Sequence, residues 1–218
     1  MNFEVIDNIF QVILLLIMAL LSLGASVRQR DRRPLVLAFA YLCFAMGTLY
    51  YVLYLVIIGK VPQIFYVAEI SWLASYLFFL SLQILRSEKL RIRFSVPALL
   101  CAMLVAAGVM VFRIFGPSLV MSGLLAVTVG VNAYLSVFRI QEKRQNREVD
   151  VGMLVCIILQ IALYAVSELM TDYTHFNIYF AVDITLSGCL AAMLPLIAPT
   201  GQFLAQMPQR LQISSSTT

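Results

Sequence analysis

The sequence has little of what soluble enzymes and metal proteins depend on. Its 218 residues include one histidine, one tryptophan and four cysteines, and only 12% of them are charged. The lone histidine, His175, excludes bis-histidine haem and a histidine-rich metal centre. It also leaves the serine and threonine hydroxyls without the partner that a Ser-His-Asp hydrolase requires. The glycine patterns of Walker and dinucleotide-binding loops are absent as well.

The cysteines do not form a recognisable site either. Cys43, Cys101, Cys156 and Cys189 all fall within long apolar runs, and no two of them have CxxC spacing. We expect free, buried thiols and no zinc site. The sequence therefore predicts no cofactor, no metal and no enzymatic activity. Acid–base hydrolysis by membrane-embedded carboxylates is an alternative that it leaves open.

What the chain has in excess is apolar sequence, because 62% of its residues are hydrophobic. A membrane-spanning helix needs about 20 consecutive apolar residues, and the chain has seven such runs. The first run is polar only at Gln11, Ser22 and Ser26, and we expect it to pack and anchor. The loops leave no room for a soluble domain, so residues 1–201 form one transmembrane domain and residues 202–218 a short cytoplasmic tail. We predict an all-α integral membrane fold with helices at Ile9–Val27, Leu35–Ile58, Ile64–Leu85, Val96–Phe115, Leu119–Phe138, Val151–Met170 and Ile178–Ala198.

Basic residues are concentrated on one side of this predicted bundle. Thirteen of the 15 lysines and arginines lie in the odd-numbered loops or the tail, and the two others are Lys60 and Arg113. The positive-inside rule then places the odd-numbered loops and the C-terminus in the cytoplasm and the N-terminus outside. Arginine clusters next to helix ends are topology signals and lipid-headgroup contacts, so we expect the lipid bilayer and no nucleic acid as a partner.

The N-terminal sequence MNFEVIDN is acidic, and no small-residue cleavage site follows the first apolar run. We therefore expect an uncleaved first helix rather than a secretory signal. The predicted localisation is the plasma membrane, as a multi-pass protein, and the compact loops favour a prokaryotic inner membrane.

The third run carries the most informative residue, Glu69. On a helix, Glu69, Trp72, Tyr76 and Gln83 share one face. A carboxylate at this depth is costly against lipid and normally faces the bundle interior, a water-filled cavity or a partner. The same signature returns in the seventh run, where Asp183 takes the place of Glu69. We expect the bundle to bring these two segments close together.

A third carboxylate, Glu168, lies near the outer end of the sixth run, at a height similar to that of Glu69 and Asp183. We expect no comparable acid in the inner half. Carboxylates ringed by aromatic faces suit a desolvated cation, through charge pairing and cation–π attraction. The aromatic residues that can surround these acids are Trp72, Tyr50, Tyr54, Tyr76, Tyr164 and Tyr179.

These acids have other possible roles. They can hydrogen-bond across helices, or pair with Arg113, and so stabilise the bundle without a ligand. Glu168 can be an interfacial residue that faces water, and Tyr50 and Tyr54 can belong to an aromatic belt. Crowded acids in a low-dielectric site also tend to hold a proton, which makes proton coupling or pH sensing available to them.

Sliding the chain against itself by 114 residues indicates an internal repeat. Glu69-Ile70-Ser71 then lies over Asp183-Ile184-Thr185, and the arginine loops align as well. The first and fifth helices are assigned to the repeat by their order alone. We predict a three-helix unit that occurs twice in the same orientation, at about 9–85 and 119–198, joined by an inverting linker helix at about 96–115.

This 3+1+3 layout resembles the superfamily proposed to join SWEET and PQ-loop transporters, microbial rhodopsins and seven-helix receptors. The resemblance covers the whole length of the chain in layout, and two features depart from it. The dipeptide Pro62-Gln63 sits in an external turn rather than inside a helix. The only lysines, Lys60, Lys89 and Lys143, lie in loops, so the chain is not a retinal protein.

Two functions remain open. The first is a receptor or sensor module that binds a small cationic or protonated ligand from outside, favoured by helices that are nearly all unbroken and by acids in the outer half. Its output would require a cytoplasmic or membrane protein partner that contacts the Arg-rich inner loops. The second is a proton-coupled secondary transporter that uses Glu69 and Asp183. The repeat favours transport, whereas the lack of paired Pro or Gly breaks in equivalent helices counts against it.

Overall fold

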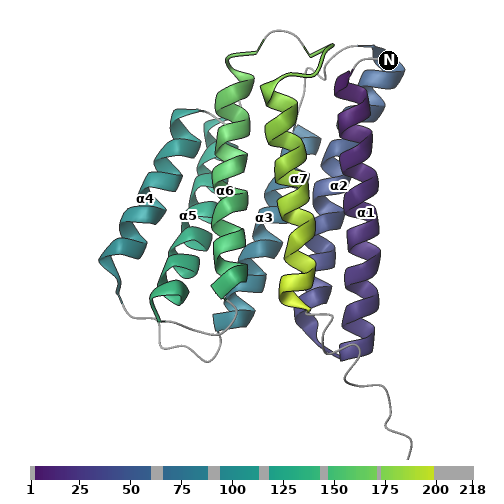
Figure 1. The fold of residues 1–218 in the computed structure, drawn as a ribbon. Helices are drawn as coiled ribbons and strands as arrows, with labels where there is room; N and C mark the ends of the chain where they lie inside the picture. The colour runs from purple at the N-terminus through teal and green to yellow at the C-terminus, as the bar shows by residue number, and fades with distance from the viewer. Residues whose placement is uncertain are drawn as a thin grey trace, which may run out of the picture.

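The structure is a computed structural model that describes residues 3–59, 66–87, 94–112, 118–142, 147–170 and 173–198, with only the backbone of Tyr66. These residues form seven α-helices, which confirms the predicted all-helical fold (Figure 1). The Pro62-Gln63 turn, Arg113 and the tail at 202–218 lie outside the described residues. The helices are α1 (Phe3–Gln29), α2 (Arg32–Ile58), α3 (Tyr66–Ser87), α4 (Val96–Val111), α5 (Leu119–Gln141), α6 (Arg147–Ser167) and α7 (Ile178–Ile197).

Among the described helices, α1, α2, α3, α5, α6 and α7 are long enough and apolar enough to cross a membrane. The described part of α4 has 16 residues, about 24 Å at 1.5 Å per residue, and is shorter than the bilayer core. Leu20, Met103 and Val127 point outward from the bundle and are 68%, 63% and 66% exposed. The Ser81 hydroxyl on this surface donates to Leu77 O of its own helix at 2.9 Å. Such a surface suits lipid, and the fold is compatible with a multi-pass membrane protein.

Local sequence determines several helix ends. The Asp31 carboxylate accepts a hydrogen bond from Arg33 N at 3.0 Å and caps α2. The Asn177 side-chain oxygen accepts from Tyr179 N at 2.9 Å and caps α7 in the same way. Gly59 ends α2 in the left-handed conformation, with φ of 70°, which glycine adopts without steric cost.

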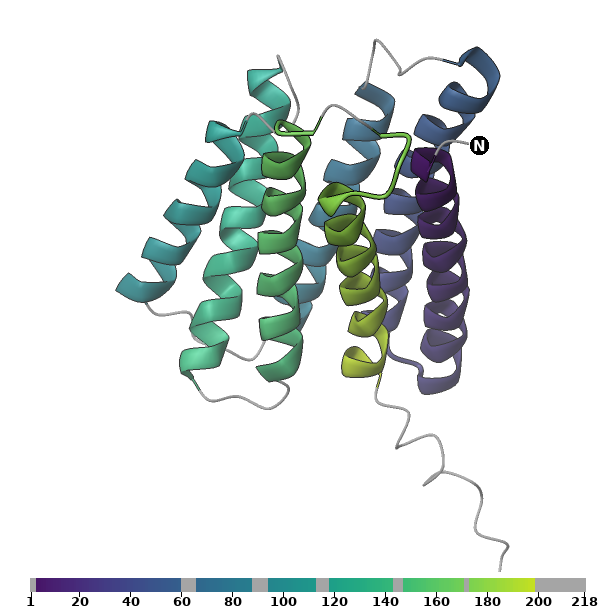
Figure 2. The ribbon, with the colours of Figure 1, turned by 45° about the horizontal axis from the view of Figure 1, so that its top comes forward.

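Six helices form a closed ring in the order α1, α2, α3, α5, α6 and α7, and α4 packs outside the ring against α5 and α6 (Figures 1 and 2). Successive helices run in opposite directions. The arginines of the described residues lie at one end of the bundle, where α2, α4 and α6 begin, at the bottom of Figure 1. We call this the arginine end, and we call the opposite end, where α1, α3, α5 and α7 begin, the far end.

The ring consists of two trios of consecutive helices. In one trio α1 packs on α2 and α2 on α3, and in the other α5 packs on α6 and α6 on α7. The trios meet where α3 packs against α5, and again where α7 packs against α1 and α2. The two polar clusters described below lie at these two junctions.

Candidate functional site

At the far end, hydrogen bonds join four helices around Asp183 on α7. Gln11 on α1 donates from Nε2 to Asp183 Oδ1 and to Ser187 Oγ, in both cases at 2.8 Å. Gln11 Oε1 accepts from Thr48 Oγ1 on α2 at 2.8 Å, and Trp72 Nε1 on α3 donates to that hydroxyl at 3.5 Å. All of these side chains except the half-buried Trp72 are buried. We call these five residues the far-end network.

Asp7, one turn before Gln11 on α1, extends the far-end network. Its side chain interacts electrostatically with that of Asp183, and the residue is only 4% exposed. Asp7 Oδ2 accepts no hydrogen bond from a described donor. Two carboxyl groups therefore meet in the interior where α1 packs against α7.

A pair of aromatic rings covers these two carboxyl groups on the far-end side. Phe3 lies about one turn before Asp7 on α1, and Phe180 about one turn before Asp183 on α7. Their ring centroids are 4.7 Å apart with an interplanar angle of 63°. The Phe3–Phe180 pair therefore lies between the carboxyl groups and the far end of the bundle.

Tyr173 and Thr174, which precede α7, contact the start of α1. Tyr173 O accepts a hydrogen bond from Glu4 N at 3.3 Å, and the Tyr173 hydroxyl donates to Ser167 O at 3.1 Å. Partial burial, and then the nearby Glu4 and Glu168 carboxyl groups, raise the pKa of Tyr173. The phenol therefore stays protonated and keeps its donor role toward Ser167 O.

Glu69 lies on α3 at the same end and is 6% exposed. Its Oε2 is buried and has no hydrogen-bond partner among the described residues. Trp72, one turn further along α3, packs tightly on α2, because a Cβ atom built on Gly47 would lie 2.8 Å from Trp72 Nε1. Tyr164 on α6 has both Glu69 and Asp183 as electrostatic neighbours. The two carboxyl groups thus face one interior region although α3 does not pack against α7.

The remaining residues of the predicted site lie at varied distances from this region. Tyr179 has Asp183 as an electrostatic neighbour, whereas Tyr76 donates to Gln160 Oε1 at 2.9 Å deeper in the bundle. The rings of Tyr50 and Tyr54 are half-buried on α2, with centroids 6.3 Å apart. Glu168 follows the end of α6 and is exposed. The structure therefore gathers part of the predicted site and leaves Glu168 on the surface.

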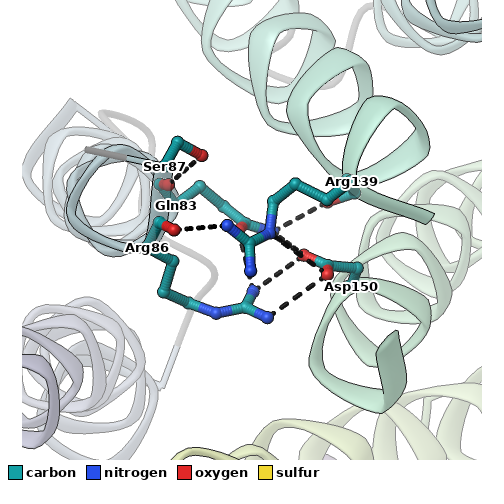
Figure 3. Close-up of polar contacts among 6 residues, drawn as sticks. Gln83, Arg86, Ser87, Arg139 and Asp150 are labelled. Atoms are coloured by element: carbon teal, nitrogen blue, oxygen red, sulfur yellow. Dashed lines mark hydrogen bonds and ion pairs between the residues drawn. The ribbon is translucent and has the colours of Figure 1, made fainter. Parts of the chain in front are cut away.

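A second buried cluster lies at the arginine end (Figure 3). Arg86 on α3 donates from Nη1 to Asp150 Oδ1 at 2.7 Å and from Nη2 to Oδ2 at 3.2 Å. Arg139 on α5 donates from Nε to both oxygens of the same carboxylate at 3.2 Å, and from Nη1 to Arg86 O. Gln83 Nε2 donates to Ser136 Oγ at 2.8 Å and to Asp150 Oδ1 at 3.3 Å. We call these five residues the arginine cluster.

The arginine cluster joins the two trios, because Arg86 belongs to α3 and its partners belong to α5 and α6. The side chains of Arg86 and Asp150 are 4% and 1% exposed, so the ion pair is withdrawn from water. Removing one partner from such a pair costs about 3–5 kcal/mol, since it leaves a buried charge uncompensated. The cluster therefore fixes the arginine end of this junction.

The arginine cluster was not predicted from the sequence, and the buried Asp150 contradicts the expectation that the inner half holds no acid. The apolar pattern places Asp150 just before the sixth helix, and Arg86 and Arg139 are interpreted as loop residues that determine topology. In the structure α6 begins at Arg147, so Asp150 lies in its first turn. The sequence signal that could have indicated the cluster is Arg86, three residues beyond Gln83 on the polar face of α3.

The role of Asp7 and Gln11 is missed as well, because α1 is interpreted as a packing helix. Their spacing of four residues puts both side chains on one helix face. That spacing, together with an acid inside an apolar helix, is the signal that could have indicated a polar site on α1.

A groove of about 520 Å³ lies between α6 and α7 on the outside of the ring. None of the predicted ligand-binding residues lines it. Its lining residues are Arg147, Glu148, Val151, Gly152, Val155, Cys189, Ala192 and Leu196.

Comparison with protein-family models, with curated proteins and with solved structures finds no match to this chain. What the site can do therefore follows from its own chemistry. The far end holds buried carboxyl groups, which bind positive charge, whereas the arginine end holds an acid already neutralised by guanidinium groups.

Proposed function

We propose that this protein is a seven-helix receptor or sensor module that binds a small cationic ligand at the far end, between Glu69 and Asp183. The observation that carries the proposal is the Glu69 carboxyl group, which is 6% exposed and has an oxygen without a described partner. Withdrawing an unpaired carboxylate from water costs several kcal/mol. A bound cation or a proton removes that cost.

The arrangement of charge supports this proposal. The described arginines lie at the arginine end, and His175, the basic side chain of the described far end, is exposed in the segment after α6. Lys60 and Arg113 lie outside the described residues. A ligand with an ammonium group would supply the positive charge that the described interior lacks around Glu69 and Asp183.

The predicted repeat also supports a free carboxyl group at Glu69. With an offset of 114 residues, Asp183 corresponds to Glu69, and the Gln11 that donates to Asp183 has Leu125 as its counterpart. The helix order agrees with this correspondence, since α7 packs on α1 as α3 packs on α5. If the repeat extends to α1 and α5, Leu125 would correspond to Gln11, and the Glu69 carboxyl group would have no matching amide donor to compete with a ligand.

Aromatic side chains next to the carboxyl groups favour an organic ammonium ion over a hydrated metal ion. Trp72 lies three residues after Glu69, and Tyr164 is an electrostatic neighbour of both acids. Indole and phenol faces attract a desolvated cation by about 0.5–2 kcal/mol each. The class of ligand that suits this combination is a small amine or quaternary ammonium ion.

The proposed function also requires an orientation in the membrane, with the far end outside. With all described arginines at one end, the positive-inside rule places the arginine end in the cytoplasm and the N-terminus outside. α4 is then the seventh span and the linker between the two trios, and a partner that contacts the arginine-rich end would transmit the signal.

Thermal unfolding of the purified full chain in nanodiscs tests ligand binding. Choline is the probe, and its neutral isostere 3,3-dimethyl-1-butanol is the matched control ligand. We expect choline to raise the melting temperature and the neutral alcohol to leave it unchanged. A bound ligand at 100 times its Kd stabilises the folded state by about 2.7 kcal/mol. Glu69→Gln should abolish the shift, whereas Glu168→Gln, at an exposed acid, should keep it. Equal shifts with both ligands would contradict the proposal.

A second candidate is a proton-coupled secondary transporter, and the arginine cluster is the observation that favours it. The cluster closes the junction of the trios at the arginine end, while the far-end carboxyl groups lie at the opposite end of the bundle. Movement of one repeat against the other around a fixed site is a common transport mechanism.

Counterflow of labelled choline in proteoliposomes distinguishes the two functions. Uptake that Glu69→Gln and Asp183→Asn both abolish would favour transport. Binding without any movement of choline would favour the receptor.

A further inference from the structure

Asp7 and Asp183 meet where α7 packs against α1, at one of the two junctions of the trios. They are 4% and 5% exposed, and their side chains lie within reach of each other, since Asp7 is one turn before the Gln11 that donates to Asp183. The Phe3–Phe180 pair covers them on the far-end side. The two carboxyl groups belong to different trios. Their protonation state therefore affects how tightly α1 and α7 pack at the far end.

A hydrogen bond between two carboxyl groups requires a proton, because an ionised carboxylate only accepts. The Gln11 amide already donates to Asp183 Oδ1 at 2.8 Å, and its orientation is fixed by Thr48 Oγ1, which donates to Gln11 Oε1. No described group donates to Asp7 Oδ2. Two ionised carboxylates side by side in a dry interior would repel each other strongly. One shared proton turns that repulsion into a hydrogen bond.

Among the described residues, the arginines lie at the opposite end of the bundle, and His175 at the far end is exposed. Apart from the exposed His175, the other titratable side chains described in this part of the far end are carboxylic acids and phenols. From α1, α2, α3, α6 and α7 and the segment after α6 they are Glu4, Tyr51, Glu69, Tyr164, Tyr179 and Tyr173.

We propose that Asp7 and Asp183 form a proton-binding pair that closes the α1–α7 junction while it holds one proton. Release of the proton places two negative charges face to face beneath the Phe3–Phe180 pair and loosens the far end. The pair shares Asp183 with the proposed cation site, but it binds its proton whether or not a ligand is present.

Infrared spectroscopy of the full chain in phosphatidylcholine nanodiscs, without added ligand, tests the proton directly. We expect the carbonyl-stretch band of a protonated carboxyl group at neutral pH. Labelling aspartate with ¹³C should shift this band, which separates it from any signal of Glu69. The band should disappear as the pH is raised, and it should be missing in Asp7→Asn and in Asp183→Asn.

Asp31→Asn, at a partly exposed aspartate that caps α2, is the matched control and should keep the band. A folded wild-type protein without a ¹³C-sensitive band at any pH would overturn the proposal. A band that both interior variants retain would overturn it too. The wild-type measurement decides the question even if a variant fails to fold.

Hydrogen exchange tests whether the proton closes the junction. After correction for intrinsic rates, amide exchange in the first turns of α1 and α7 should become faster as the pH rises in the wild type. The increase should be smaller in Asp7→Asn, because the new side-chain amide donates to Asp183 and does not titrate. Identical pH dependence in the two proteins would overturn the closing role. Neither measurement uses choline, so failure of the proposed ligand site would leave this result intact.

Discussion

At the scale of single residues, Gly47 allows the close approach of α2 and α3 beside Glu69. A Cβ atom on Gly47 would lie 2.8 Å from Trp72 Nε1 and 3.0 Å from Ala68 O. Contacts this short force a neighbour to move, and Ala68 O is backbone. The indole of Trp72 is the group that can move, and it donates to Thr48 in the far-end network.

We predict that Gly47→Ala displaces Trp72 and destabilises the protein by about 1–3 kcal/mol, as overpacking typically does. Because Trp72 is the only tryptophan, a shift of its emission spectrum reports the displacement. Gly24→Ala is the control, since a Cβ atom there meets nothing within 4 Å. That control should be neutral or stabilising by up to about 1 kcal/mol, because alanine is the better helix former. An unchanged spectrum in Gly47→Ala would refute the close contact.

The buried Glu69 carboxyl group lowers the stability of the folded protein, and a binding site can retain such a group because the ligand needs it. Glu69→Gln removes a buried ionisable group whose Oε2 has no described partner. We predict that it raises the unfolding free energy of the ligand-free protein by roughly 0.5–2 kcal/mol, as in other trade-offs between stability and function. Glu168→Gln should change it little, because Glu168 is exposed. Destabilisation by Glu69→Gln would indicate that the carboxyl group has a structural role.

At the scale of helices, α3 contributes to both polar regions. Its polar face carries Glu69 and Trp72 near the far end and Gln83 and Arg86 near the arginine end. The face from Glu69 to Gln83 can be predicted from helical spacing alone. Arg86 cannot be assigned to it from the sequence, because an arginine that ends a span is also a normal topology signal. Only the packing of α3 against α5, and of α5 against α6, shows that it pairs with Asp150.

We predict that Asp150→Asn destabilises the bundle by about 3–5 kcal/mol, because it removes the carboxylate that the buried Arg86 and Arg139 share. α6 should then separate more often from α3, and the buried Cys156 of α6 should react faster with a thiol reagent. The background protein would have Cys43, Cys101 and Cys189 replaced by serine or alanine.

The matched control is Asp31→Asn, which removes a surface ion pair of 3.0 Å to Arg33 and retains a capping side chain. Exposed pairs of this kind contribute about 0–1 kcal/mol. Equal effects of the two substitutions would show that the buried cluster does not hold the helices together.

At the scale of the whole molecule, the helical architecture could be predicted and the interior could not. Apolar runs of about 20 residues locate the helices, because a bilayer requires that length. α1 begins at Phe3 rather than Ile9, and α6 at Arg147 rather than Val151, since polar residues such as Asp7 and Asp150 interrupt the apolar pattern. Each of these residues contacts a partner that lies far away in the sequence. Such contacts leave no periodic signal in the sequence.

Seven spans place the two ends of the chain on opposite sides of the membrane, whereas six place them on the same side. We predict an N-terminal reporter that is accessible from outside and a C-terminal green fluorescent protein that is fluorescent in the cytoplasm. A C-terminal alkaline phosphatase fusion should be inactive. Reporters on the same side would show that α4 does not span, and would contradict the two parallel trios.

The central claim is that the far-end carboxyl groups bind a small cation, and Trp72 emission measures this most directly. Tetramethylammonium would be titrated into the full chain in nanodiscs at constant ionic strength, with wild type, Glu69→Gln and Glu168→Gln compared. The account predicts a saturable change in wild type and Glu168→Gln, and an affinity at least about tenfold weaker in Glu69→Gln, which corresponds to about 1.4 kcal/mol. The same affinity in all three proteins, or no saturable change in any of them, would contradict it.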